Sequence, residues 1–337
     1  MADRQASFDL AARAGLRWVN DETPGHRRIR RGKGFSYVDQ DGQTVSDDDR
    51  RWIESLVIPP AWTDVWISTD RRGHLLATGK DDADRKQYIY HPDWEEARDA
   101  AKFDRMGEFA ERLPVLRQRV EEDLGGTGLA KDKVIALSVA ILDRTLIRVG
   151  SRQYAEANDS YGLTTLTPDH VRVGAGRVVF SFTGKGGIDQ EVVLSDGKLA
   201  RLVGQSIDLG GETVLGYLTD GGVTAVSPED VNQYLAERAG EDFTAKDFRT
   251  WGATAIVVGE LAQASPSDLS PDKQFLSAID IAADRLGNTR DVCRTSYVHP
   301  IVEAALEDGT LTSIWKRSRK GRWTSRSESA TRKLLES

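Results

Sequence analysis

Four residues in short, distinctive contexts suit phosphate chemistry. Arg148 lies in LIRVGSRQY, Lys185 in FTGKGG, Arg249 in KDFRTWG and Tyr297 in GNTRDVCRTSY. A guanidinium group matches phosphate oxygens, an ammonium group carries a transferable proton, and a phenol can act as a nucleophile. Each residue also has an ordinary structural explanation: arginines cap helices, lysines occupy exposed turns, and tyrosines pack half-buried. Taken singly, the four residues therefore leave the function open.

The common signatures of cofactor and metal sites are absent from the sequence. Gly184-Lys185 lacks the upstream glycine and the following Ser or Thr of a phosphate-binding P-loop. Asp39-Gln-Asp-Gly has no carboxylate at the twelfth position of a calcium loop. The five histidines show no metal-ligand spacing, and the single cysteine, Cys293, excludes an internal disulfide and a cysteine-built zinc site. We therefore expect neither cofactor nor metal.

The distribution of charge matters more than its sum. A net charge of −7 is unusual for a protein that binds nucleic acid. Binding, however, responds to local potential within a Debye length of roughly 8–10 Å. Two stretches are locally basic, Arg27 to Lys33 and Lys316 to Arg326. Since charge runs are usually solvated surface, composition leaves nucleic acid open as a partner without favouring it.

The first ninety or so residues are expected to form a small β-rich domain. Short alternating runs at 35–38, 62–68, 75–79 and 87–90 are separated by turn residues. His91-Pro92 breaks this pattern, and a long helical stretch begins at Asp93. We therefore place a domain boundary near residue 92.

Beyond that boundary the sequence predicts a larger, mainly helical domain over residues 93–315. Apolar residues recur at helical spacing in 100–113, 131–149, 228–237, 245–263 and 271–286. A three-stranded antiparallel sheet over 171–173, 177–182 and 190–194 interrupts the helices, with glycine-rich turns between its strands. The tail, residues 316–337, is basic and serine-rich and is expected to be loosely ordered. The predicted fold class is α+β.

Several motifs in one order resemble the type IB DNA topoisomerases of bacteria and poxviruses, over essentially the whole chain. RKQYIYHPDW at 85–94 and PGHRRIRRGKGFSY at 24–37 resemble segments of the family's N-terminal domain. Arg148-Val-Gly with YGLTTL at 161–166 resembles the segment of the first catalytic arginine. The segments around Lys185, Arg249 and Tyr297 resemble those of the catalytic lysine, the second arginine and the nucleophile.

The resemblance implies a metal-free and ATP-free reaction. Tyr297 would attack a DNA phosphate, Arg148 and Arg249 would hold its non-bridging oxygens, and Lys185 would protonate the departing 5′ oxygen. Positive and negative supercoils would relax while the broken strand rotates about the intact one. The partner would be double-stranded DNA, clamped by a monomer. With no membrane-spanning run and no secretory signal, we expect a bacterial protein in the cytoplasm, associated with the nucleoid.

One catalytic position departs from the family pattern. Many members place a histidine nine residues before the nucleophile, where this chain has Asn288. An amide can donate a hydrogen bond to phosphate but carries neither charge nor a transferable proton. We expect the hydrogen-bonding role to survive. The resemblance also implies DNA contacts by Gln87, Tyr88, Tyr90 and Tyr154, with the alternative that alternate tyrosines line a β core.

Two alternative functions stay open. The tyrosine site-specific recombinases share this catalytic set, and Lys246-Asp-Phe-Arg249 fits their pattern. The N-terminal motifs argue against them, because recombinases usually carry a helical clamp there. A catalytically impaired DNA-binding protein is the second alternative, and Asn288 gives it some weight. Relaxation of any supercoiled plasmid by a monomer would separate the topoisomerase from both.

Overall fold

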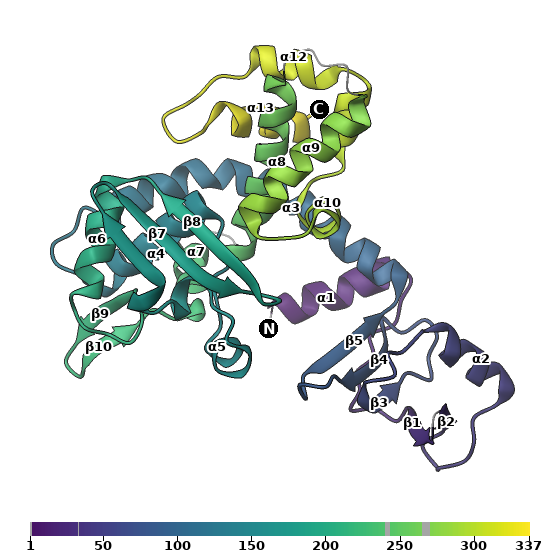
Figure 1. Ribbon diagram of the computed structural model, residues 1–337. Helices are drawn as coiled ribbons and strands as arrows, with labels where there is room; N and C mark the ends of the chain where they lie inside the picture. The colour runs from purple at the N-terminus through teal and green to yellow at the C-terminus, as the bar shows by residue number, and fades with distance from the viewer. Residues whose placement is uncertain (1, 33, 240–242, 265–269) are drawn as a thin grey trace. The chain divides into compact units, whose positions relative to one another are not determined.

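The chain forms two compact units. The computed structural model describes residues 2–32, 34–239, 243–264 and 270–337. Unit 1 comprises residues 1–103 and unit 2 residues 104–337, so the division falls inside helix α3 (Pro92–Asp123). In Figure 1 a small β-rich unit is purple to blue, and a larger, mostly helical unit runs from teal to yellow. These units confirm the α+β fold class. The expected domain boundary near residue 92, where α3 begins, stays a prediction.

Unit 1 is built on one antiparallel sheet with the strand order β2-β1-β3-β4-β5. One face of the sheet packs on α2 through a core that includes Ile53, Val65 and Ile67. Its helices and strands are α1 (Ala2–Arg13), β1 (His26–Arg31), β2 (Gly34–Val38), α2 (Asp47–Ser55), β3 (Thr63–Ile67), β4 (Leu75–Lys80) and β5 (Lys86–Tyr90).

Strand β1 coincides with the basic stretch of the sequence. Arg28 does not point its charge freely into solvent: its guanidinium donates to the carbonyl oxygens of Ile58 at 3.1 Å and Trp62 at 2.6 Å and lies over the Phe35 ring. Part of the positive charge of this stretch is therefore engaged in contacts within unit 1. Lys33, the last cation of the stretch, lies outside the described residues.

Unit 2 surrounds helix α4 with helices and a three-stranded antiparallel sheet of order β6-β7-β8, as expected. Nearly every residue of α4 from Val134 to Leu142 is buried, which makes it the central helix. Across the described residues, every helix is too short or too polar to span a membrane. The elements are α4 (Lys131–Thr145), α5 (Arg152–Asn158), β6 (Val171–Gly174), β7 (Arg177–Gly184), β8 (Ile188–Leu194), α6 (Gly197–Ile207), β9 (Gly216–Thr219), β10 (Gly222–Ala225), α7 (Pro228–Ala239), α8 (Ala245–Gln263), α9 (Pro271–Leu286), α10 (Arg290–Tyr297), α11 (Ile301–Glu307), α12 (Thr310–Arg317) and α13 (Arg326–Leu335).

The C-terminal segment corrects one expectation. Instead of a loose tail, residues 326–335 form helix α13, which packs against α8. The two helices approach so closely that a Cβ on Gly259 would lie 2.5 Å from the Ser327 hydroxyl. The buried side of α13 carries Ala330, Thr331 and Leu334. These buried residues recur at helical spacing, but the abundant serine and arginine around them make the segment look disordered in the sequence.

Candidate active site

Arg148 lies just beyond α4 on a segment fixed by two glycines. Helix α4 ends at Leu146, which takes a left-handed φ of 59°. Beyond Arg148, Gly150 (φ +98°) lies against Gly162, where a Cβ would be 2.5 Å from the Gly150 Cα. The N–H of Leu163 donates to the Arg148 carbonyl at 2.8 Å. The glycines of RVG and YGL therefore allow two chain segments to touch, and this contact fixes the backbone that carries Arg148.

Arg249 is buried in the first half of α8, with 4% of its surface exposed. Its guanidinium donates to the carbonyl of Leu146, at the end of α4, and to that of Leu286, at the end of α9, at 2.9 Å. Gly252 leaves room for this packing, because a Cβ there would lie 2.7 Å from the Leu146 side chain. The Arg249 side chain therefore connects α8 to the ends of α4 and α9 by hydrogen bonds.

Tyr297 is the last residue of α10. This short helix is capped by Thr289, whose hydroxyl accepts the Val292 N–H, and it buries Cys293 against the core. The Tyr297 ring faces Arg249, with 5.1 Å between the ring centroid and the guanidinium carbon. The Thr254 hydroxyl of α8 contacts the Tyr297 carbonyl at 3.2 Å. Helix α8 therefore holds both Arg249 and the backbone of Tyr297.

The environment of Tyr297 favours its ionised form. Burial acts to raise the pKa of the phenol, but the charge and hydrogen bonding of Arg249 and the charges of Arg148 and Lys246 outweigh it. The net result is a Tyr297 pKa below the ordinary value of 10. A phenol with a lowered pKa offers more of the nucleophilic phenolate at neutral pH.

Asn288 follows Gly287, the left-handed cap of α9, and lies beside Arg148. Its Oδ1 accepts a hydrogen bond from Arg148 Nη2 at 2.5 Å. Its Nδ2 is buried and has no hydrogen-bond partner among the described residues, and the Nε of Arg249 is a second donor in this state. Buried unpaired donors are costly, so one on the Asn288 amide and one on the Arg249 guanidinium, close to Arg148, indicate a site for an anion.

Lys185 is exposed in the turn between β7 and β8. The turn lies between Gly184 and Ile188, which pair across the hairpin, and Gly186 and Gly187 take left-handed φ values of 82° and 73°. Lys185 lines a small cavity together with Arg148 and Arg249. The five predicted catalytic residues therefore come from five segments of unit 2: the end of α4, the β7–β8 turn, α8, the end of α9 and α10.

The electrostatics of this cluster suit an anion. Burial and the neighbouring charge of Arg148 lower the pKa of Arg249 to about 10, which still leaves the guanidinium charged at neutral pH. A buried cation that lacks a carboxylate partner among the described residues is stabilised when an anion arrives. In such a site fixed donors bind charge strongly, because little water competes.

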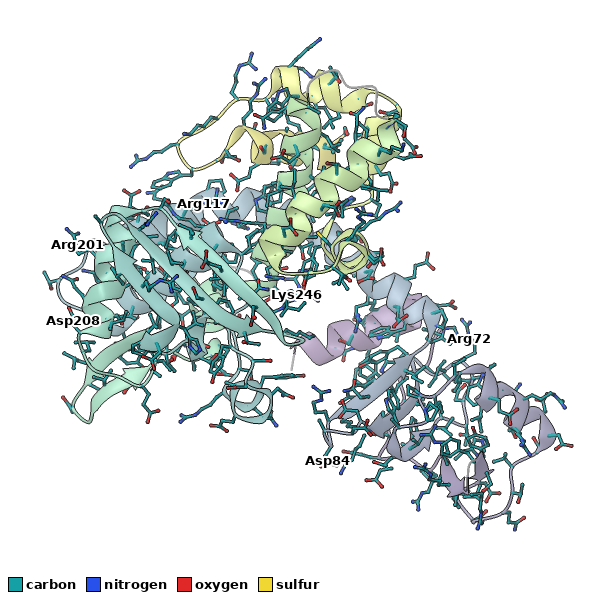
Figure 2. The ribbon with its side chains drawn as sticks, viewed as in Figure 1. Arg72, Asp84, Arg117, Arg201, Asp208 and Lys246 are labelled. Atoms are coloured by element: carbon teal, nitrogen blue, oxygen red, sulfur yellow. The ribbon has the colours of Figure 1, made fainter. Side chains whose placement is uncertain are left out.

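Sequence reasoning assigned no role to two further residues near the cluster. Lys246, on the first turn of α8, contributes to the lowered pKa of Tyr297 (Figure 2). Its place three residues before Arg249 was the available signal, since that spacing puts both on one helix face. Gln190 of β8 lines the cavity and lies against Gly287, where a Cβ would be 2.0 Å from its Oε1. Nothing in the sequence pointed to that long-range contact.

The predicted DNA-contact residues outside the cluster lie in separate places. In unit 1, the pleat of β5 puts Tyr88 and Tyr90 on one face, with their rings stacked at 5.8 Å. Tyr88 is 46% exposed, whereas Tyr90 packs against a small core around Trp94. Gln87 lies on the other face and donates to Asp81 at 2.8 Å. In unit 2, Tyr154 is 51% exposed on α5.

Comparisons with known proteins give a consistent family. The model of the eukaryotic DNA topoisomerase I catalytic core matches residues 91–310, and that of the bacterial DNA topoisomerase IB N-terminal domain matches residues 34–81. DNA topoisomerase 1B of Acanthamoeba polyphaga mimivirus is 30% identical over 274 residues, covering 78% of this chain and 81% of the viral one. DNA topoisomerase 1B of vaccinia virus (strain Copenhagen) is 24% identical over 293 residues, covering 80% and 86%.

A solved structure of the XerH site-specific recombinase bound to palindromic difH substrate overlaps 73% of this chain and 60% of its own, at 18% identity and a TM-score of 0.37. A likeness at this score supports no conclusion about function. The two family models, in contrast, match both units in chain order. The chain therefore belongs to the type IB DNA topoisomerases, a family of isomerases.

Proposed function

We propose that this protein relaxes positive and negative supercoils in double-stranded DNA through a transient 3′-phosphotyrosyl bond to Tyr297, without ATP or metal. The observation that carries the proposal is the cluster in unit 2, in which the Tyr297 ring faces Arg249. Two buried donors of this cluster, Arg249 Nε and Asn288 Nδ2, lack a partner among the described residues. A DNA phosphate is an anion that would satisfy these donors.

The cluster supports a balanced transesterification. The Tyr297 phenolate attacks phosphorus and forms a new P–O bond, while the bond from phosphorus to the 5′ oxygen breaks. Arg148, Arg249 and the Asn288 amide hold the non-bridging oxygens as charge develops on them. The electron pair of the broken bond stays on the 5′ oxygen, which takes a proton from Lys185. Because one phosphoester replaces another, the reverse attack reseals the strand without ATP.

We propose that the protein acts as a monomer whose unit 1 closes over the duplex opposite unit 2. Exposed Tyr88 and Tyr154 are suited to contact DNA directly. Gln87 and Tyr90 would have to exchange their present contacts with Asp81 and Trp94 to do so. Phosphate contacts would dominate such a clamp, so its affinity would fall steeply with salt. This function would place the protein in the cytoplasm, at the nucleoid.

Plasmid relaxation in EDTA tests the proposed function. We expect complete relaxation of positively and of negatively supercoiled plasmid without ATP or added metal, because all the proposed chemistry comes from side chains. The measurement is a topoisomer ladder on agarose, with the Tyr297→Phe variant as the inactive control. A strict requirement for magnesium or ATP would contradict the proposal. Activity confined to plasmids with paired recognition sites would favour a recombinase.

Replacing Lys185 tests the proton donor. Lys185→Ala should slow cleavage by roughly 100-fold or more, since general acids contribute about 10²–10⁴-fold. The side chain is exposed in a turn, so the fold should be unaffected. Cleavage should recover on a substrate whose 5′ leaving group is a thiolate, which departs without protonation. The matched control is Lys198→Ala, an exposed lysine on α6 of the same unit. A lack of recovery would remove the general-acid role.

A further inference from the structure

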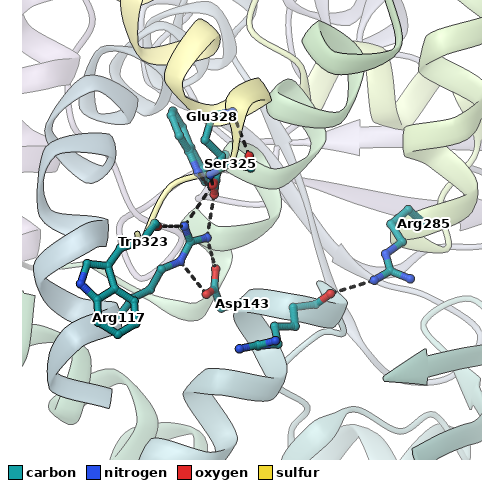
Figure 3. A network of polar contacts seen from close by, with 8 residues as sticks. Arg117, Asp143, Arg285, Trp323, Ser325 and Glu328 are labelled. Carbon is teal, nitrogen blue, oxygen red and sulfur yellow. Dashed lines mark hydrogen bonds and ion pairs between the residues drawn. The ribbon is translucent and has the colours of Figure 1, made fainter. Parts of the chain in front are cut away.

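A buried ionic network links the C-terminal helix to the body of unit 2. Arg117 of α3 donates to Asp143 of α4 at 2.7 and 2.8 Å and to Glu328 of α13 at 2.6 and 3.0 Å (Figure 3). Glu328 is 8% exposed and also accepts the indole N–H of Trp251, on α8, at 3.1 Å. Four helices therefore meet at one guanidinium and one carboxylate.

Two branches of this network lead to the helices that hold the proposed catalytic arginines. Trp251 is two residues from Arg249 on α8, so its bond to Glu328 fixes the rotation and position of that helix. Asp143 lies in the last turn of α4, just before Leu146, whose carbonyl accepts a bond from Arg249. Arg148 follows on the same segment. The network therefore holds both helices within a few residues of the two arginines.

The electrostatics of the network favour one fixed geometry. Burial acts to raise the pKa of Glu328, but the bonds and charge of Arg117 outweigh it, and the pKa lies below its ordinary value. Both partners therefore stay charged. A buried ion pair contributes little net stability because desolvation offsets its attraction, yet its bidentate bonds restrict position and angle. Such a pair suits a structural constraint better than a source of stability.

We infer that Glu328 and Trp251 are positioning residues, through which α13 and Arg117 hold Arg249 and Arg148 in the geometry needed to bind the DNA phosphate. This inference rests on the proposed function. The residues touch no reacting atom and act through the helices. A displacement of about 1 Å at the arginines would slow cleavage by up to roughly 100-fold. The C-terminal helix then contributes to the rate of cleavage although it carries no catalytic residue.

Trp251→Phe tests the inference because it removes one N–H donor and keeps an aromatic ring. The matched control is Tyr234→Phe. Tyr234 and Trp251 are each 3% exposed, and Tyr234 donates to Asp123 at 2.7 Å, a carboxylate that is also paired with an arginine. We expect Trp251→Phe to cleave at least about 10-fold slower with saturating enzyme, at unchanged DNA affinity. Tyr234→Phe should cleave at nearly the wild-type rate.

The pH profile separates positioning from general loss of structure. Since Arg249 lowers the pKa of Tyr297, a displaced Arg249 should shift the rise of cleavage with pH upward in Trp251→Phe and not in Tyr234→Phe. Glu328→Gln, a second variant, should behave like Trp251→Phe. Combining the two should slow cleavage no more than Glu328→Gln alone, because the Trp251 contact that Trp251→Phe removes is one of the contacts of Glu328.

Two negative results are distinguishable. A wild-type protein that forms no adduct with DNA would overturn the proposed function and this inference with it. An active wild type, with Trp251→Phe and Glu328→Gln both matching Tyr234→Phe in rate and pH profile, would overturn the inference and leave the proposed function intact.

Discussion

Tyr297→Phe is expected to abolish the covalent adduct with DNA and all plasmid relaxation while leaving non-covalent binding nearly unchanged. The substitution removes the phenolic oxygen and keeps the ring, which lies 5.1 Å from the Arg249 guanidinium. The contacts that hold α10 include the Thr289 cap, buried Cys293 and the Thr254 hydroxyl, none of which uses that oxygen. The hydrogen bonding of the phenolic oxygen is with Arg249, which carbonyl oxygens hold in place independently. The fold and the phosphate site should therefore persist without a nucleophile.

Two measurements check this result side by side. An SDS-trapped adduct on end-labelled duplex reports the covalent step, and a gel-shift titration reports binding. Tyr234→Phe, which loses a buried tyrosine hydroxyl that donates to Asp123 and to no residue of the cluster, should retain the adduct. If the adduct persists in Tyr297→Phe, another residue is the nucleophile.

The sequence predicted local structure well where one short pattern determines it. Strands β6, β7 and β8 of unit 2 and helices α8 and α9 appear close to their expected limits. Glycines in the β7–β8 turn take the left-handed conformations that a tight hairpin needs. The segment that carries Arg148 was also predictable, because its RVG and YGL motifs contain Gly150 and Gly162, the two glycines of the close backbone contact. These features depend on neighbours in the chain or on a conformation few residues adopt.

The remaining features depend on partners distant in the sequence. Glu328 binds an arginine 211 residues away and a tryptophan 77 residues away, and no local pattern encodes either contact. A serine- and arginine-rich segment therefore looked like a loose tail although its helix is docked. Strand β1 was missed for a related reason, since Arg28 hydrogen-bonds to a distant loop from an otherwise basic run.

The location of the unpaired cations reconciles the acidic net charge with a DNA partner. Arg148, Lys246 and Arg249 act on one tyrosine, and Lys185 lines a small cavity with the two arginines. None of these four cations forms an ion pair with a carboxylate among the described residues. Arg117, in contrast, is neutralised by Asp143 and Glu328. The cations that would meet phosphate are those left uncompensated. Local potential, and not the sum of −7, then governs binding.

Arg249→Lys should lower the cleavage rate by about 10²–10³-fold, the usual effect of removing one preorganised donor. The planar guanidinium bonds to the carbonyls of Leu146 and Leu286 and still presents an unpaired Nε. A lysine ammonium keeps the charge but offers its donors from a single atom, so it cannot hold both carbonyls and the phosphate together. A slower cleavage rate in a variant that keeps the positive charge would show that cleavage requires the planar guanidinium group with its several donors.

The same variant should change the pH dependence in a defined direction. Arg249 is the largest influence that lowers the pKa of Tyr297 against the effect of burial, through its charge and hydrogen bonding. A displaced ammonium would leave burial less opposed, so the pKa would rise and the phenolate would form at higher pH. The second-order rate constant for cleavage, which reports the free enzyme, should therefore rise at higher pH in Arg249→Lys than in the wild type.

Arg238→Lys on α7 is the matched control. Arg238 is paired with Asp123, so this substitution should change neither the cleavage rate nor its pH dependence. A wild-type rate and profile in Arg249→Lys would mean that a point charge is sufficient, and the bidentate phosphate site proposed for Arg249 would be wrong.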